Sequence, residues 1–156
     1  MNKNGPIIVI EDDADDQEML VEIFLKLGYK NKIFYFRDGD IALEFINKID
    51  VQPFLILSDI NMPRINGFEV RNKVFTNAAL HTKCIPYLFF TTSASKKAVM
   101  DAYALSVQGF FVKATSMQGL ENTIKKIVEY WKECIAPSEF DWDWKHKVLI
   151  NNMDNL

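Results

Sequence analysis

The sequence predicts an α/β protein in which strands and helices alternate as (βα)₅ and the strands form a doubly wound, five-stranded parallel sheet. Two observations support this fold class. Short apolar runs alternate with amphipathic segments through most of the chain, and runs such as FLIL and YLFF are apolar at every position, as in strands that helices cover on both faces. The chain has 156 residues, enough for one domain with a full hydrophobic core.

The expected strands are short and rich in β-forming residues, and each is followed by a segment whose apolar residues recur at helical spacing. The strands cover residues 6–11, 32–36, 54–58, 85–91 and 109–113. The helices carry, in order, Leu20, Ile23, Phe24 and Leu27; then Ala42, Phe45, Ile46 and Ile49; then residues 67–76; then Val99, Met100 and Tyr103 within residues 95–106; and finally Leu120, Ile124, Ile127, Val128 and Trp131.

Residues with known preferences for helix ends set the bounds of three of these helices. Gly28 is expected to end the first helix, and Asp38 to cap the start of the second. The last helix is expected to begin with a capping box made by Thr115 and Gln118, and to end before Pro137.

Composition and charge exclude several classes of protein. The net charge of -3 argues against a broad nucleic-acid-binding surface. No apolar run approaches the ~20 residues that span a bilayer, and the amino terminus turns acidic directly after its short apolar run, unlike a secretory signal. We therefore expect a cytoplasmic protein that binds neither nucleic acid nor membrane. Its two cysteines, Cys84 and Cys134, are expected to be reduced and partly buried, with no metal.

Polar and charged side chains stand at the carboxyl ends of four expected strands, the edge at which open parallel sheets bind their ligands. Glu11 and Asp12 close the first strand, Asp59 the third, Thr91 the fourth and Lys113 the fifth. Grouped carboxylates repel one another unless a cation joins them, and an all-oxygen site with open positions suits Mg²⁺. The sequence therefore predicts a Mg²⁺ site at this edge.

This constellation suits the transfer of a phosphoryl group to a carboxylate. A metal ion would neutralise charge while the nucleophile and the leaving group stay in line. Lys113 would supply a second cation for the product or for the free Asp59 carboxylate, and the Thr91 hydroxyl would bond a phosphoryl oxygen. Simpler roles, namely helix capping and first-turn acids favoured by the helix dipole, are expected for Asp13, Asp15 and Asp16.

At these residues the sequence resembles the receiver domains of bacterial two-component response regulators, over residues 5–135. The family's acidic pair falls on Glu11-Asp12, its phosphoacceptor strand and turn on SDINMPRINGFE with Asp59 as acceptor, its conserved Ser or Thr on Thr91, and its lysine on Lys113. The resemblance implies a flavodoxin-like sheet with strand order 2-1-3-4-5. It is strongest to short, single-domain regulators of the chemotaxis type.

The resemblance also implies the ligands of the Mg²⁺ ion. Asp12 and Asp59 would bind it directly, the backbone carbonyl of Asn61 would complete the protein ligands, and Glu11 would act through water. Phe110 falls at the family's aromatic switch position, where tyrosine is common, and would respond to movement of the conserved hydroxyl.

By the same resemblance, the protein takes a phosphoryl group from a histidine kinase or a phosphotransfer protein onto Asp59. It hydrolyses the product slowly, so it is a substrate more than an enzyme. It then signals through the face formed by the fourth helix, the fifth strand and the fifth helix, which Thr91 and Phe110 would couple to the site. Residues expected to contact partners there are Ala94, Lys96, Lys97 and Tyr103.

One departure from the family lies beside the lysine. The family's lysine is normally followed by proline in a cis peptide bond, whereas Ala114 follows Lys113 here. A cis bond without proline costs ~2.5–4 kcal/mol. A trans bond with a rerouted loop is therefore favoured over a strained cis bond.

Three alternative functions have different sequence requirements. An aspartyl-nucleophile phosphatase of the haloacid dehalogenase type carries a second Asp two residues after its nucleophile, where this chain has Asn61. A flavodoxin-like flavin binder needs a hydroxyl- and glycine-rich phosphate loop after the first strand, and Glu11, Asp12 and Asp13 would repel that phosphate. A phosphorylation-independent interaction module with an inherited acidic pocket stays open.

The chain is expected to divide into a receiver domain, residues 1–136, and a tail, residues 137–156, too short for a DNA-binding output domain. The tail alternates Phe140, Trp142 and Trp144 with acidic residues, a period of two that suggests an extended ribbon with one aromatic face. Two hypotheses fit this pattern. The aromatic face packs on the protein's own surface, or the tail is an arm that binds a partner or forms a homodimer, as the signalling face also could.

Overall fold

A five-stranded parallel sheet forms the centre of the molecule, with strand order β2-β1-β3-β4-β5. The computed structural model describes residues 1–48 and 50–139. Its strands are β1 (Ile7–Ile10), β2 (Ile33–Phe36), β3 (Leu55–Ser58), β4 (Tyr87–Thr91) and β5 (Gly109–Val112). The sheet and its strand order confirm the predicted doubly wound, flavodoxin-like fold.

Helices connect the strands and follow the last one. They are α1 (Ala14–Leu27), α2 (Gly39–Ile46), α3 (Gly67–Thr76), α4 (Ala78–His81), α5 (Lys96–Ala104), α6 (Met117–Glu133) and the 3₁₀ helix η1 (Pro137–Glu139). The short α4 was not expected, because a helix of 4 residues is too short to show a periodic pattern. The predicted fourth and fifth helices are therefore α5 and α6.

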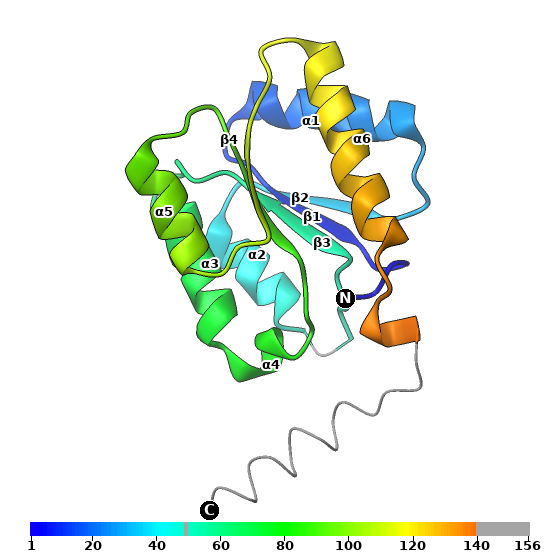
Figure 1. The fold of residues 1–156 in the computed structure, drawn as a ribbon, viewed down its shortest axis with the longest axis vertical. Coiled ribbons are helices and arrows are strands. Elements are labelled where there is room, and N and C mark those ends of the chain that lie inside the picture. The colour runs from blue at the N-terminus through cyan, green and yellow to red at the C-terminus, as the bar shows by residue number, and fades with distance from the viewer. Residues whose placement is uncertain (49, 140–156) are drawn as a thin grey trace, which may run out of the picture.

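Helices cover both faces of the sheet, which explains why the strands are apolar at successive positions (Figure 1). Side chains alternate between the two faces of a strand. Ile7 and Val9 therefore pack in the core that contains α1 and α6, while Ile8 and Ile10 pack in the core that contains α2 and α3. All four side chains are at most 1% exposed. The sheet is the middle of three layers.

Helix ends agree with the prediction in α1 and α2. Gly28 follows α1 in the left-handed conformation, with φ 64°, and its N–H donates to a carbonyl of the last turn. Asp38 caps α2 with its side chain. Asp13 caps α1 by accepting the N–H groups of Asp15 and Asp16, which confirms its predicted capping role.

The predicted start of α6 is wrong by one residue. Ser116 is the N-cap and accepts the N–H of Gly119 at 3.1 Å, so Thr115 and Gln118 do not form a capping box. Both Thr115 and Ser116 are good capping residues, and the path of the chain after β5 decides between them. The helix ends before Pro137, as expected.

The aromatic ribbon predicted for the tail, with Phe140, Trp142 and Trp144, lies outside the described residues. So does Ile49, which was expected on the apolar face of the second helix. Among the helices of residues 1–48 and 50–139, none combines the length and the hydropathy needed to cross a bilayer.

Cys84 is exposed rather than partly buried, which corrects the prediction. It lies in the turn between α4 and β4 with φ 50°. The preceding Lys83 points inward, where its ammonium donates to three backbone carbonyls in residues 46–51. Cys134 is half-buried, as expected.

Arg71 joins the end of α5 to α3. Its side chain is 5% exposed, and its Nε and Nη2 donate to the carbonyls of Leu105 and Ser106 at 2.8 and 2.7 Å. The guanidinium also lies over the ring of the buried Tyr87, 5.3 Å from the ring centre. These contacts satisfy carbonyls that a helix end leaves without partners.

Gly67 sets how closely α3 approaches the end of β3. Its N–H donates to the carbonyl of Ile60 at 2.9 Å. A Cβ atom at this position would overlap the carbonyl oxygen of Asp59 and lie 2.8 Å from the Cα of Ile60. Both are backbone atoms, so no rotamer change relieves the overlap. Glycine is therefore required at position 67, because the backbone of residues 59–60 lies too close for a Cβ atom.

Gly67→Ala is expected to lower the free energy of unfolding by about 2–3 kcal/mol, because the added methyl group meets backbone. Urea unfolding measures this. The matched control is Asn72→Ala, at an exposed position of the same helix, which is expected to change the free energy by less than ~0.5 kcal/mol. A Gly67→Ala protein as stable as the wild type would show that α3 can move away from β3 at little cost.

Candidate functional site

Parallel pairing brings the ends of β1, β3, β4 and β5 to one edge of the sheet. Ile10 pairs with Ser58, and the N–H of Asp59 donates to the Ile10 carbonyl at 2.9 Å, so the residues that follow β1 and β3 lie at the same level. Further along the edge, the N–H of Lys113 donates to the carbonyl of Thr91 at 2.7 Å. The strand ends named from the sequence therefore form one edge.

Three carboxylates meet there. Oxygen atoms of Glu11, Asp12 and Asp59 all lie within 4.8 Å of one another. Glu11 and Asp59 are buried, at 1% and 7% exposed, whereas Asp12 is half-buried. Asp59 Oδ1 accepts the N–H of Ile60 at 2.6 Å, which fixes the orientation of the carboxylate. The grouping agrees with what the sequence predicted for these three residues.

Lys113 reaches this cluster from β5, and a fourth acid holds it. Its Nζ lies 2.5 Å from Glu11 Oε2, 2.6 Å from Asp16 Oδ2 and 3.7 Å from Asp59 Oδ2. The sequence reasoning missed Asp16, which it treated only as a first-turn acid. The contact joins the first turn of α1 to the residue that follows β5, and no local sequence pattern marks it.

Burial and charge shift the pKa values of the two closest partners. Burial raises the pKa of Glu11 to about 7, although the hydrogen bond from Lys113 opposes the shift. Burial alone would lower the pKa of Lys113, but its hydrogen bonds to Asp16 and Glu11 and the charge of nearby Asp59 raise it above its ordinary value. The ammonium is therefore charged, and the acids around it outnumber it.

This donor set fits a hard divalent cation. The clustered side chains offer only carboxylate oxygens, which Mg²⁺ and Mn²⁺ prefer. Asp12 is the half-buried member, so the cluster opens to solvent on its side. Burial and, to a lesser extent, the charge of Asp59 raise the pKa of Glu11, and a cation placed there would offset both effects. Glu11, Asp12 and Asp59 are the residues that would hold it.

The remaining predicted residues lie in β4, in β5 and in the loop after β3. Thr91 is fully buried, and its hydroxyl has no hydrogen-bond partner in the part of the chain that the structure describes. Phe110 is half-buried and packs edge-on against Phe89, with ring centres 6.1 Å apart. Asn61 is exposed in the loop after β3. The structure thus puts an unsatisfied hydroxyl beside the lysine-bearing strand.

The bond between Lys113 and Ala114 is trans, as the sequence favoured, since no peptide bond within residues 1–48 and 50–139 is cis. A cavity of about 290 Å³ opens beside these two residues. Asp16 and Thr92 also line it. Its apolar lining residues are Met19, Leu20, Phe90 and Leu120. Lys113 and its partner Asp16 therefore both border this cavity.

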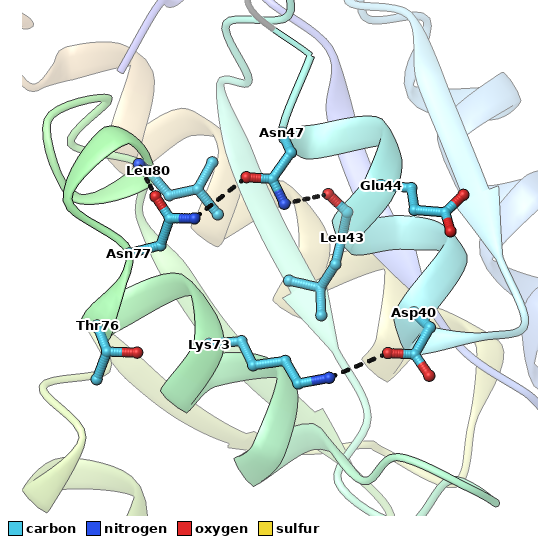
Figure 2. A pocket seen from close by; sticks show the side chains of 8 residues that line it. All are labelled: Asp40, Leu43, Glu44, Asn47, Lys73, Thr76, Asn77 and Leu80. Atoms are coloured by element: carbon cyan, nitrogen blue, oxygen red, sulfur yellow. Dashed lines mark hydrogen bonds and ion pairs between the residues drawn. The ribbon is translucent and has the colours of Figure 1, made fainter.

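Figure 2 shows a second hollow of about 670 Å³, between α2, α3 and α4. Lys73 pairs with Asp40 at 3.2 Å, and the Asn77 side chain donates to that of Asn47 at 3.4 Å. These polar groups bind one another, and the hollow includes none of the predicted site residues. The strand-end cluster is the better candidate for a functional site.

Comparison with known proteins identifies the family. The family model for the response regulator receiver domain matches residues 7–125. The chain belongs to the receiver domain family. This receiver domain is 29% identical over 129 residues to the probable methanogenesis regulatory protein FilR2 of Methanothrix harundinacea, a match that covers 80% of this chain and 82% of that protein. It is 28% identical over 135 residues to the response regulator Rcp1 of Synechocystis, covering 83% and 90%.

Solved structures agree with the fold of this receiver domain. The crystal structure of the Mn(2+)-bound form of response regulator Rcp1 superposes with a TM-score of 0.74 at 26% sequence identity. The match covers 85% of this chain and 97% of that one. The resemblance that the motifs indicated is confirmed at the level of the family and the fold.

Millimolar Mg²⁺ is expected to raise the melting temperature of the wild-type protein, because the ion would bind the folded acidic cluster and not the unfolded chain. Each 1 kcal/mol of such stabilisation corresponds to about 2–4 °C in a domain of this size. Asp12→Ala is expected to shift much less, and calorimetric scans with and without Mg²⁺ measure the difference.

The control for this experiment is Asp15→Ala, which removes an exposed acid from the first turn of α1, three residues after Asp12, without touching the cluster. It should respond to Mg²⁺ like the wild type. Equal shifts in the wild-type and Asp12→Ala proteins would count against the metal assignment.

Proposed function

We propose that this receiver domain is a cytoplasmic response regulator that accepts a phosphoryl group on Asp59 from the phosphohistidine of a histidine kinase or phosphotransfer protein, with Mg²⁺ as cofactor. One observation carries the proposal: the buried Asp59 carboxylate shares a cluster with Glu11 and Asp12 while the Lys113 ammonium lies 3.7 Å from its Oδ2. A nucleophile, a set of cation ligands and a fixed positive charge are thus in one place.

In the proposed reaction an oxygen of Asp59 attacks the phosphorus. The bond from phosphorus to the histidine nitrogen breaks, and its electron pair returns to the imidazole, which takes up a proton. The Ile60 N–H holds Asp59 Oδ1 and so keeps the carboxylate in one orientation. Lys113 pairs with a phosphoryl oxygen after transfer. When bound, Mg²⁺ supplies charge neutralisation on the phosphoryl oxygens.

The Thr91 hydroxyl is the proposed sensor of the phosphoryl group. A buried hydroxyl without a partner costs about 1–3 kcal/mol, and a phosphoryl oxygen would supply the missing acceptor. Phosphorylation would then favour a conformation in which Thr91 lies against the acceptor. Phe110, on the neighbouring strand, has room to respond because it is only half-buried. Two such states with different affinity for phosphate are what a switch requires.

The proposed signalling face consists of α5, β5 and α6. Its large apolar side chains are unusually exposed: Met100 62%, Tyr103 54%, Val112 50% and Met117 39%. Met100 and Tyr103 lie on one side of α5 as expected, and that side faces solvent rather than the core. The expected contact residues Ala94, Lys96 and Lys97 are also exposed. Exposed apolar groups on adjacent elements are typical of a surface that binds a partner or a second copy.

Incubation with acetyl phosphate or phosphoramidate and Mg²⁺ is expected to add one phosphoryl group to the wild-type protein, as read by intact mass. Asp59→Asn should gain none, because an amide is not a nucleophile in this reaction. Asp40→Asn, a surface control, should be modified like the wild type. No adduct on the wild type would sink the proposal and would favour a phosphorylation-independent interaction module.

Thr91→Val is expected to raise the free energy of unfolding by about 1 kcal/mol, because it replaces the unpartnered hydroxyl with a methyl group of similar shape. The same protein should still be phosphorylated, yet its NMR spectrum should change little at Phe110 on phosphorylation. Thr92→Val, at an exposed neighbouring position, should leave both properties unchanged. A full response at Phe110 in Thr91→Val would remove Thr91 from the switch.

A further inference from the structure

We propose that Asp16 is a positioning residue that holds the Lys113 ammonium on the α1 side of the site and competes with the phosphoryl group for it. The inference rests on the proposed function, because it concerns the lysine that would bind the phosphorylated acceptor. Its basis is the contact between Lys113 Nζ and Asp16 Oδ2 at 2.6 Å, against 3.7 Å to Asp59 Oδ2.

The distances show which partners the lysine has in this conformation. Glu11 and Asp16 lie 2.5 Å and 2.6 Å from the ammonium, both within hydrogen-bond distance, and both bonds join opposite charges. The separation to Asp59 exceeds the range of a hydrogen bond. The ammonium is thus hydrogen-bonded to Glu11, which follows β1, and to Asp16 in α1, whereas it contacts the acceptor only through a longer ion pair.

The fold fixes Asp16 in this role. It lies in the first turn of α1, and its own N–H donates to the cap Asp13 at 3.0 Å, so the start of the side chain is held by the helix cap. Asp16 is 23% exposed and Lys113 6%, so the pair is shielded from most of the solvent. A contact of this kind is stronger than one on an open surface.

Asp16 differs from Glu11 in what else it would bind. Glu11 belongs to the group of carboxylates that would hold a divalent cation, and a bound cation would draw it away from the lysine. Asp16 is not in that group, so it would remain a partner of Lys113 when a divalent cation is bound. The cavity of about 290 Å³ beside both residues leaves the lysine space to change partners.

The consequence is a competition. To pair with a phosphoryl oxygen, Lys113 must give up or share Asp16. Neutralising Asp16 removes the competing partner, so the lysine becomes available to the phosphoryl group, and the phosphorylated state gains affinity. Asp16 therefore biases the protein toward the unphosphorylated state.

The test is the affinity of the full chain for beryllium fluoride, an analogue of the phosphoryl group, measured by calorimetry in the presence of Mg²⁺. Asp16→Asn is expected to bind it at least about fivefold more tightly than Asp15→Asn. Both substitutions remove one negative charge from the same helix turn, but Asp15 is exposed and has no ion pair in the described part of the chain. Melting temperatures establish that both proteins are folded.

A second pair of proteins isolates the lysine. In a Lys113→Met background, Asp16→Asn and Asp15→Asn should no longer differ, because the group for which Asp16 competes is gone. Equal affinities of the two aspartate variants with Lys113 present, or a difference that persists without it, would overturn the role of Asp16 while leaving the proposed function intact. Absence of binding to the wild-type protein would instead overturn both.

Discussion

The site depends on one electrostatic constraint: the carboxylates of Glu11, Asp16 and Asp59 lie around the ammonium group of Lys113, and Asp12 adds a further carboxylate beside Glu11 and Asp59. Negative charge in excess, partly removed from water, is unfavourable. The groups cannot spread apart, because the register of the parallel sheet fixes the strand ends that carry most of them. The folded chain therefore keeps an edge that gains free energy when a cation binds to it.

The sequence was sufficient to predict this edge because a strand that can be located from its apolar residues also locates the residue at its carboxyl end. Apolar runs locate the strands, parallel pairing brings their carboxyl ends together, and the polar residues Asp59 and Lys113 then fall at one edge. Asp16 could not be found in the same way. Its contact depends on the distance between the first turn of α1 and the end of β5, which no local pattern records. The prediction of the α6 N-cap was wrong for a related reason. Thr115 and Ser116 are equally good capping residues, and only the path of the chain after β5 decides between them.

The two cores of the protein have different relations to the site. Both cores contain aromatic side chains, but the core on the face of α2 and α3 is the one in which rings from several elements contact one another in a chain. Phe110 contacts Phe89, and Phe89 in turn contacts Phe68 at the start of α3, with ring centres 5.2 Å apart. Rings from β5, β4 and α3 thus lie edge to face in the layer that also contains α5. Any reorientation of Phe110 must be accommodated by these neighbours.

The contact of Arg71 with the carbonyls of Leu105 and Ser106 anchors the two ends of α5 unequally. The carboxyl-terminal end is anchored to α3 by a buried guanidinium. The amino-terminal end follows an exposed segment, residues 92–95, and its polar contacts, the Ser95 cap on the N–H of Ala98 and the pair of Lys97 with Asp101, stay within the helix and its cap. A helix held in this way pivots more easily than it slides. Its exposed face near Met100 and Tyr103 would therefore change in tilt, with the displacement greatest at the end closest to Thr91.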